Sequence, residues 1–374
     1  MIILHVCRQY LPCRGGVERF VNDLAVRLVQ RGHQAQVATL DACFTRPDRK
    51  LPHREIVNGV PTARLRYVGG PLAFFAPGVL RLAREADILH IHNTDFFLDY
   101  LALTQPVHHK PFVLSTHGGY FHTPAFKWVK TLAFHSLTRF SLSRAAFVIA
   151  DSAADAARFG PVSRHLRRVE NGVDTEAFAG IQKIIEPGRL LYHGRLAANK
   201  RCDLLLALLA ALRRRGANAR LILSGTGRPG ELEALQARAA TLGVADLVSF
   251  EGEVDDRRLR ENLARAHLFL SASEYEAFGI SVAEALASGT VPVVSDIEAH
   301  RELVEDGVSG FLTDFENPVA AAEKVRVALS IPLDRLAVMG EAGRARIRQN
   351  DWEQVVPAFE AIYEEALGGS IYKA

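Results

Sequence analysis

Short runs of apolar residues alternate with longer amphipathic stretches along this chain. The run Ile2–Val6 leads into a loop with two adjacent glycines, and apolar residues then recur at positions 17, 20, 21, 24, 25 and 28. That spacing places them on one side of a helix. A second strand is expected near residues 36–40. A strand, a glycine-containing loop, a helix and a strand in this order form a βαβ unit, so the pattern predicts a parallel sheet.

The pattern occurs in both halves of the chain. The first half has three more continuous apolar runs, which indicate strands covered on both faces: Ile88–His92, Phe112–Ser115 and Phe147–Ala150. Residues 179–188 lack periodicity and indicate a hinge. The second half then shows a helix and five expected strands: Asp203–Arg213, and Leu190–Gly194, Arg220–Ser224, Val248–Phe250, Leu268–Ser271 and Val291–Val294.

These elements predict an α/β protein of two Rossmann-like domains that face each other across a cleft. A chain of 374 residues is long enough for two domains with separate cores. We expect the first domain over residues 1–178 and the second over residues 187–350. An amphipathic helix within residues 353–374 ends the chain, and its pattern alone does not say where it packs.

Composition indicates a globular protein without a membrane span. Hydrophobic residues make up 48% and charged residues 23% of the chain, as in ordinary globular domains. The longest aliphatic run, Leu204–Leu212, is far shorter than the ~20 residues that cross a bilayer. The first residues lack the features of a secretion signal, so we expect a cytoplasmic protein. Its four cysteines have no metal-binding spacing and are expected to be reduced thiols.

Charge is unevenly distributed between the two halves. Residues 1–180 contain 22 Lys and Arg against 14 Asp and Glu, whereas residues 181–374 contain 23 against 28. A basic first half is suited to an anionic ligand or surface, although chance surface composition is an alternative.

The stretch from Ser271 to Ala287 carries the clearest chemical signal. Glu276 and Glu284 flank Phe278, Gly279 and Ile280, between an expected strand and an expected helix. Glycine lets a backbone approach a ligand, and the free N–H groups at a helix start attract phosphate. Two carboxylates beside such a cradle suit a nucleotide-sugar, which has hydroxyl groups on both sides of its phosphates. The alternative is that Glu284 only closes a capping box that begins at Ser281.

Two basic residues follow another strand of the same predicted sheet. Arg195 and Lys200 come after Leu190–Gly194, where a guanidinium and an ammonium group could clamp a diphosphate. Their charges would compensate a departing nucleoside diphosphate, so no metal is expected. The alternative reading is two solvated basic residues near a helix start. Asp255 and Asp256 are interpreted as the charged start of a helix.

Among the histidines of the first half, His117 is the best functional candidate. It ends a buried strand and precedes two glycines. A loop histidine that caps local backbone is the alternative. A zinc site at His90 and His92 is rejected, because the sequence offers no further ligands at metal-binding spacing.

Together these motifs resemble the retaining GT-B glycosyltransferases of family 4. The resemblance rests on Glu276 and Glu284 (E-x7-E) and on Arg195 and Lys200 (G-R-x-x-x-x-K), and it covers nearly the whole chain. Two positions depart from the usual pattern, Ala277 in place of glycine and Glu170 in place of proline.

The resemblance implies a role for each motif residue. Glu276 would hold hydroxyls of the donor sugar and Glu284 the ribose, while Arg195 and Lys200 would hold the diphosphate. His117 would stabilise the reacting sugar and Gly16 would leave room for phosphate and acceptor. Phe278, Gly279, Ile280 and Gly252, the last in the expected base-binding loop, would complete the donor site. The closing helix within residues 353–374 would pack on the first domain.

Residues 95–104 and 115–123 resemble more closely the α-mannosyltransferases of xanthan- and acetan-type exopolysaccharide assembly. That subgroup implies GDP-mannose as donor and a polyprenyl-diphosphate-linked oligosaccharide as acceptor. A lipid-linked acceptor would explain why aromatic and basic residues interleave between positions 121 and 144, as on an anionic membrane surface: Phe121, Lys127, Trp128, Lys130 and Arg139. The alternative is a helix whose aromatic residues pack inward.

We therefore expect a metal-independent, retaining glycosyltransferase that is peripheral to the inner face of the cell membrane and transfers α-mannose from GDP-mannose. No nucleic-acid-binding module is recognisable. Two alternatives stay open: a GT-B enzyme that uses a UDP-sugar or epimerises a sugar, and a non-catalytic scaffold that binds a nucleotide-sugar.

Overall fold

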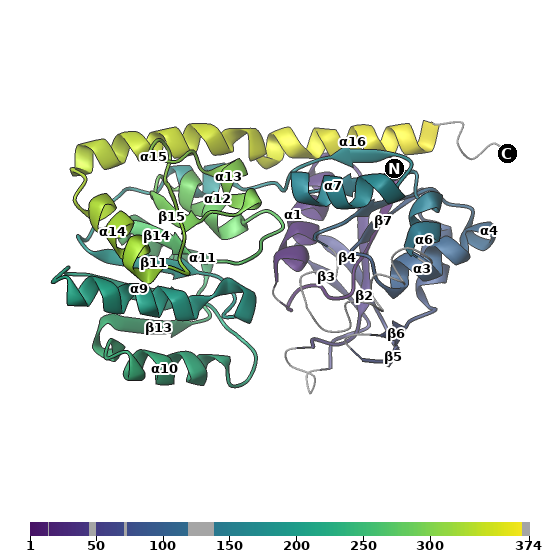
Figure 1. The fold of residues 1–374 in the computed structure, drawn as a ribbon. Coiled ribbons are helices and arrows are strands. Elements are labelled where there is room, and N and C mark those ends of the chain that lie inside the picture. The colour runs from purple at the N-terminus through teal and green to yellow at the C-terminus, as the bar shows by residue number, and fades with distance from the viewer. Residues whose placement is uncertain (14, 45–49, 71–72, 119–137, 369–374) are drawn as a thin grey trace. The chain divides into compact units, whose positions relative to one another are not determined.

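The computed structural model describes residues 1–13, 15–44, 50–70, 73–118 and 138–368 (Figure 1). Contacts divide the chain into two units, one formed by Met1–Gly172 with Trp352–Ala374 and the other by Val173–Asp351. No helix among the described residues is long and apolar enough to cross a membrane.

The first unit contains, within its described residues, an eight-stranded sheet in the order β10-β9-β8-β7-β1-β2-β4-β3. Neighbouring strands are parallel except for the antiparallel pair β3 and β4. The strands are β1 (Ile2–Val6), β2 (Gln34–Leu40), β3 (Arg54–Val57), β4 (Val60–Leu65), β7 (Ile88–His92), β8 (Phe112–Ser115), β9 (Phe147–Ala150) and β10 (Leu166–Arg168), with a separate pair β5 (Val68–Gly69) and β6 (Phe74–Phe75). The helices are α1 (Gly16–Gln30), α2 (Val79–Glu85), α3 (Phe96–Leu103), α4 (Gln105–His108), α6 (Arg139–Arg144), α7 (Ala153–Phe159) and α16 (Trp352–Gly368).

The second unit contains a six-stranded, fully parallel sheet in the order β13-β12-β11-β14-β15-β16. Its strands are β11 (Arg189–His193), β12 (Arg220–Ser224), β13 (Val248–Gly252), β14 (Leu268–Ser271), β15 (Pro292–Ser295) and β16 (Phe311–Thr313). Its helices are α8 (Thr175–Ala179), α9 (Cys202–Arg214), α10 (Glu231–Thr241), α11 (Asp256–Arg265), α12 (Ile280–Ala287), α13 (Glu298–Leu303), α14 (Pro318–Leu329) and α15 (Leu333–Ile347).

Both sheets are buried on their two faces, which explains why their strands are continuously apolar. Leu190 and Tyr192 of β11 belong to one apolar cluster, whereas Leu191 between them belongs to the cluster on the other face. In β1, Ile3 and Leu4 are divided between two clusters in the same way. Successive side chains of a strand point to opposite faces, so each apolar run contributes to two cores.

The closing helix α16 packs in the first unit. Trp352, Phe359 and Tyr363 are buried in the cluster that also contains Phe20 of α1. The Phe20 and Trp352 ring centroids lie 5.4 Å apart. The aromatic side of α16 thus covers one face of the first sheet. The helix packs there with α1 and the strands although it is far from them in sequence.

The predicted strands are confirmed, several with their bounds unchanged: Ile2–Val6, Ile88–His92, Phe112–Ser115, Phe147–Ala150, Arg220–Ser224 and Leu268–Ser271. The hairpin of β3 and β4 was not expected. Residues 179–188 hydrogen-bond to the second unit through Ile184 N to Ala264 O (2.9 Å) and Glu186 N to Arg265 O (3.0 Å). The units divide at Gly172 instead of within that segment.

Candidate functional site

The loops that follow β11 and β14 lie side by side at one edge of the second sheet. These two strands pair directly, so their carboxyl ends meet at the same edge. The main chain of Asn199 accepts a hydrogen bond from Glu274 N (2.9 Å), and its side chain donates to Tyr275 O (3.3 Å). The two loops are therefore tied together at the residues just before Lys200 and Glu276.

Lys200 and Glu276 form an ion pair at this edge. Lys200 Nζ lies 2.5 Å from each carboxylate oxygen of Glu276, and the two side chains are only 15% and 10% exposed. Ser273 also donates a hydrogen bond to Glu276 (2.7 Å). An ammonium group has three hydrogens, so one remains for a further acceptor.

The electrostatic environment keeps Glu276 ionised. Burial by itself would raise the pKa of this carboxyl, but the charge of Lys200, together with His300 and the hydrogen bonds from Lys200 and Ser273, lowers it below its ordinary value. The site therefore holds a carboxylate and an ammonium group in a partly buried position, where polar contacts are stronger than in bulk water.

Arg195 also lies at this edge. Its side chain is exposed, and its carbonyl accepts a hydrogen bond from the buried Tyr192 hydroxyl (2.7 Å). Burial raises the pKa of Tyr192, and the charges of Glu276 and Arg195 act on it in opposite directions. Both charged groups therefore lie within electrostatic range of one phenol, so Arg195, Lys200 and Glu276 gather at one sheet edge.

Three glycines bring the ends of β11, β12 and β13 close together. A Cβ atom on Gly225, whose φ is +138°, would lie 1.8 Å from Gly194 O. Gly225 N donates to Gly252 O at 2.6 Å, and Gly252 has a φ of +69°. Only glycine fits such an approach without strain. Gly252 therefore shapes the edge through its backbone.

The start of α12 lies directly after the Glu276 loop. Gly279 is its N-cap with a φ of +99°, Ile280 is its first residue, and the cap uses no side-chain hydrogen bond. Ser281 is thus inside the helix, and the capping-box alternative for Glu284 is wrong. The first N–H groups of a helix have no acceptor within it and attract anions.

Two other predicted donor residues differ in their surroundings. Glu284 is a buried carboxylate within α12, only 2% exposed. The Phe278 side chain packs in the apolar cluster with Val282 and Leu303, so only its backbone could reach a ligand. The apolar character of Phe278 was the signal for this core position.

In the first unit, Gly16 is the exposed first residue of α1, and His117 follows β8. His117 has a φ of +46°, in the left-handed region. Its Nε2 lies 3.1 Å from His92 Nδ1, and its Nδ1 lies 3.5 Å from Asp151 Oδ2.

A second carboxylate, Asp155, fixes the backbone around His117. Asp155 Oδ2 accepts hydrogen bonds from Thr116 Oγ1 (2.6 Å) and Gly118 N (2.7 Å), one on each side of His117. Burial, followed by the charge of Asp151, raises the pKa of Asp155 to about 6. Sequence reasoning missed this residue, although its place shortly after the β9 strand end was a signal.

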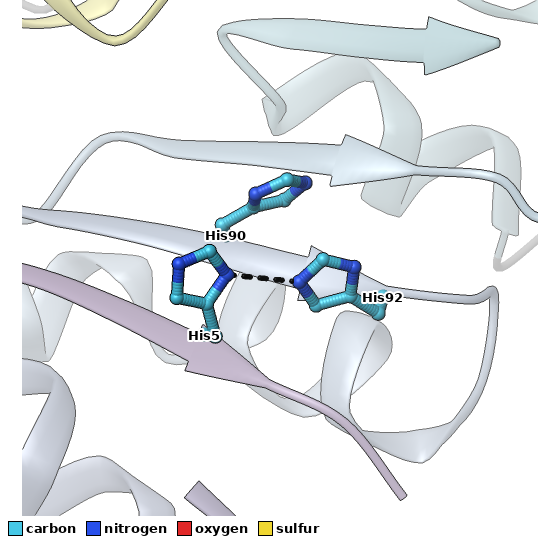
Figure 2. A group of neighbouring side chains, drawn as sticks. All are labelled: His5, His90 and His92. Atoms are coloured by element: carbon cyan, nitrogen blue, oxygen red, sulfur yellow. Dashed lines mark hydrogen bonds between the residues drawn. The ribbon is translucent and has the colours of Figure 1, made fainter. Parts of the chain in front are cut away.

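The histidines of β1 and β7 form a cluster that the sequence analysis did not foresee. His5, His90 and His92 are fully buried, and ligand atoms of the three lie within 4.8 Å of one another (Figure 2). His5 and His90 are at the same register of these paired strands. The rejection of a zinc pair for want of partners overlooked His5.

The predicted membrane stretch is described only in part. Phe121, Lys127, Trp128 and Lys130 lie outside the described residues, whereas Arg139 begins α6 and is exposed. Its neighbour Phe140 is 45% exposed, so this aromatic side chain does not pack inward.

Comparison with known proteins now identifies the family. The sequence model "Glycosyltransferase Family 4" matches residues 14–177, and "Glycosyl transferases group 1" matches residues 174–346. A GDP-mannose:cellobiosyl-diphosphopolyprenol alpha-mannosyltransferase of Xanthomonas oryzae pv. oryzae is 38% identical over 98% of both chains. The chain belongs to glycosyltransferase family 4. It is thus a glycosyltransferase, as the motifs predicted.

A second relative agrees with this assignment, and solved structures share the fold. The corresponding mannosyltransferase of Komagataeibacter xylinus is 34% identical over 100% of this chain and 95% of its own. Sucrose-phosphate synthase of Thermosynechococcus elongatus has the same fold, with a TM-score of 0.79 at 20% identity over 97% and 98% of the two chains. Anabaena HepE, solved with UDP and glucose, gives a TM-score of 0.77 at 22% identity over 99% and 100%. The GT-B fold prediction is confirmed.

The raised pKa of Asp155 predicts a pH-dependent stability. Its folded-state value of about 6 exceeds an unfolded value of about 3.9, so between these values the folded state binds more protons and stability falls as pH rises. From pH 5 to pH 7 the free energy of unfolding of the wild type should fall by about 1 kcal/mol relative to Asp155→Asn. Urea denaturation measures this, with the exposed Glu85→Gln as control. Parallel pH profiles for wild type and Asp155→Asn would contradict the prediction.

Proposed function

We propose that this glycosyltransferase transfers α-mannose from GDP-mannose to a polyprenyl-diphosphate-linked oligosaccharide, with retention of configuration and without a metal. The donor and acceptor are supported by the GDP-mannose-dependent mannosyltransferases of Xanthomonas oryzae pv. oryzae and Komagataeibacter xylinus, which are 38% and 34% identical to this chain over nearly their whole length.

The observation that carries the proposal is the Lys200–Glu276 ion pair beside Arg195 and the start of α12. A nucleotide-sugar has two sugars and a diphosphate between them. Lys200, Arg195 and the N–H groups near Gly279 would contact the diphosphate, and Glu276 would accept hydrogen bonds from hydroxyls of the mannose. Glu284 would accept hydrogen bonds from the ribose.

These contacts would act most strongly on the departing group. As the sugar–phosphate bond breaks, negative charge grows on the diphosphate, and fixed cations and N–H dipoles stabilise that charge without reorganising. Lys200 can serve this purpose while it stays bonded to Glu276, because its third hydrogen is available. Retention would follow from attack on the same face, with the leaving phosphate accepting the acceptor's proton.

His117 is proposed to contact the reacting sugar from the first unit. Its buried ring faces Asp151, with Nδ1 3.5 Å from Oδ2, and its left-handed backbone is held by the Asp155 hydrogen bonds. Such a rigid support is what a group needs if it is to meet a transition state in one orientation.

A titration with nucleotide-sugars tests the donor. A ligand that binds only the folded state raises its stability in proportion to the logarithm of concentration over Kd. GDP-mannose should raise the unfolding temperature at concentrations at least tenfold below those needed with UDP-glucose or UDP-N-acetylglucosamine. Preference for a UDP-sugar would overturn the donor assignment in favour of the UDP-sugar alternative. Donor binding without mannose transfer to a polyprenyl-diphosphate-linked oligosaccharide would favour the non-catalytic scaffold.

Variants of the ion pair test the catalytic assignment. Lys200→Met and Glu276→Gln should each lower kcat at least about a hundredfold, the usual cost of losing a group that stabilises transition-state charge. Lys200→Met should also destabilise the protein, because it leaves a partly buried carboxylate unpaired. The double variant Lys200→Met/Glu276→Gln should recover stability but not turnover.

The matched control is Lys324→Met, which removes a more exposed Lys–Asp ion pair of the same unit, with Asp306. It should leave kcat unchanged. A double variant that regained turnover together with stability would show that the pair is only structural.

Membrane association is proposed for the acceptor-facing stretch that includes Arg139 and Phe140. A basic residue near an anionic bilayer contributes roughly 1 kcal/mol, so Arg139→Glu with Phe140→Ser should lower binding to mixed phosphatidylglycerol–phosphatidylcholine vesicles severalfold in co-sedimentation. Arg335→Glu with Leu333→Ser, an exposed pair on α15, is the control. Unchanged vesicle binding would contradict the proposal.

A further inference from the structure

Four neighbouring strands of the first sheet bring polar side chains into one line. The strands β1, β7, β8 and β9 are adjacent in the sheet. His5 lies in β1 and His92 ends β7, while His117 and Asp151 follow β8 and β9. The line therefore crosses the sheet from a buried strand towards the proposed sugar contact at His117.

The ring nitrogens along this line are within hydrogen-bond distance of one another. His5 Nδ1 lies 3.1 Å from His92 Nε2, and Figure 2 shows the two rings turned towards each other. His92 Nδ1 lies 3.1 Å from His117 Nε2. This line of side chains ends at Asp151, whose Oδ2 lies 3.5 Å from His117 Nδ1.

The hydrogen positions in the chain follow from charge. Burial lowers the pKa of His5 to about 3, and it lowers the pKa of His92 well below the ordinary value, so both rings are neutral and each has one N–H. A carboxylate favours the proton on the facing nitrogen, which places the hydrogen of His117 on Nδ1. His117 Nε2 then accepts from His92 Nδ1, and His92 Nε2 accepts from His5 Nδ1.

The far end of the chain agrees with this direction. His5 Nε2 would carry no hydrogen, and this buried atom has no hydrogen-bond partner among the described residues. The reverse direction would leave a buried N–H at His5 without an acceptor. It would also place an unprotonated Nδ1 of His117 opposite the Asp151 carboxylate. Both are unfavourable, so one tautomer is selected for all three rings.

A metal ion is the competing explanation for the His5, His90 and His92 cluster. Both ring nitrogens of His92 already have partners in the chain. Those of His90 lie 2.7 Å from the Tyr363 hydroxyl and 2.8 Å from Ser115 Oγ. Coordination by all three rings would break several of these hydrogen bonds, so the geometry favours the hydrogen-bonded chain.

We propose that His92, itself held by His5, is a positioning residue that fixes the tautomer and ring orientation of His117 for glycosyl transfer. This inference rests on the proposed role of His117 at the reacting sugar. The imidazole then has a hydrogen-bond partner at Nε2 and faces the Asp151 carboxylate at Nδ1, and the backbone beside it is held by Asp155. Packing supports the same orientation, because Phe20 meets the His117 ring edge-on at 4.8 Å.

Two substitutions of His92 separate its hydrogen bond from its volume. His92→Asn keeps an N–H donor near the position of Nδ1, whereas His92→Phe keeps a ring without any donor. His92→Phe should lower kcat about tenfold or more with a smaller change in KM, as expected for a contact that acts in the transition state. His92→Asn should recover most of that loss. The matched control is His108→Phe, a buried histidine of the same unit that hydrogen-bonds to Leu101 O, and it should leave kcat unchanged.

Nitrogen-15 NMR of labelled histidines reports the tautomers directly and does not depend on activity. The chain predicts the Nδ1–H form for His5, His92 and His117 in the wild type, and a mixture of forms at His117 in His92→Phe. An Nε2–H form of His117, a stoichiometric metal in the purified protein, or equal kcat for the Asn and Phe variants would overturn the inference. A wild type that transfers no mannose would instead refute the proposed function, and the NMR result would still stand.

Discussion

The site depends on one constraint, which is that β11 and β14 are neighbours in a parallel sheet. Lys200 and Glu276 are far apart in sequence, and each follows the carboxyl end of its own strand. A parallel arrangement brings those ends to one edge, and the hydrogen bonds of Asn199 then align the two loops. The ion pair is the consequence of this topology, and the charged edge exists only while the two strands stay paired.

The ends of β11, β12 and β13 lie close together at this edge because the residues that meet there are glycines. A Cβ on Gly225 would lie 1.8 Å from Gly194 O, so glycine at this position lets the ends of β11 and β12 approach closely, and Gly225 N donates to Gly252 O at the end of β13. Buried apolar strands support this edge, and the start of α12 adds N–H groups that have no acceptor within the helix. The charged side chains and the N–H groups therefore meet at the edge of the sheet. Polar groups buried in the core of the unit would cost free energy.

The two units use one architecture for two kinds of chemistry. The second unit gathers opposite charges, which suit a ligand with phosphates and hydroxyls. The first unit gathers the buried, neutral rings of His5 and His92 next to His117, which faces Asp151. In the first unit the benefit is orientation, because hydrogen bonds in a low-dielectric interior are strong and directional.

Local sequence determined the elements and most of the candidate residues. Apolar runs give strands such as β7, β8 and β9 because both of their faces are buried, and the E-x7-E and G-R-x-x-x-x-K motifs were visible as spacings. Pairings between distant segments were decided only by the tertiary structure: Lys200 with Glu276, and His5 with His92. Ser281 shows the limit of local spacing, since a capping box from Ser281 to Glu284 fits the sequence, but the helix already begins at Ile280. The reason is physical, because strand order and register bring together residues whose separation along the chain carries no information about their distance.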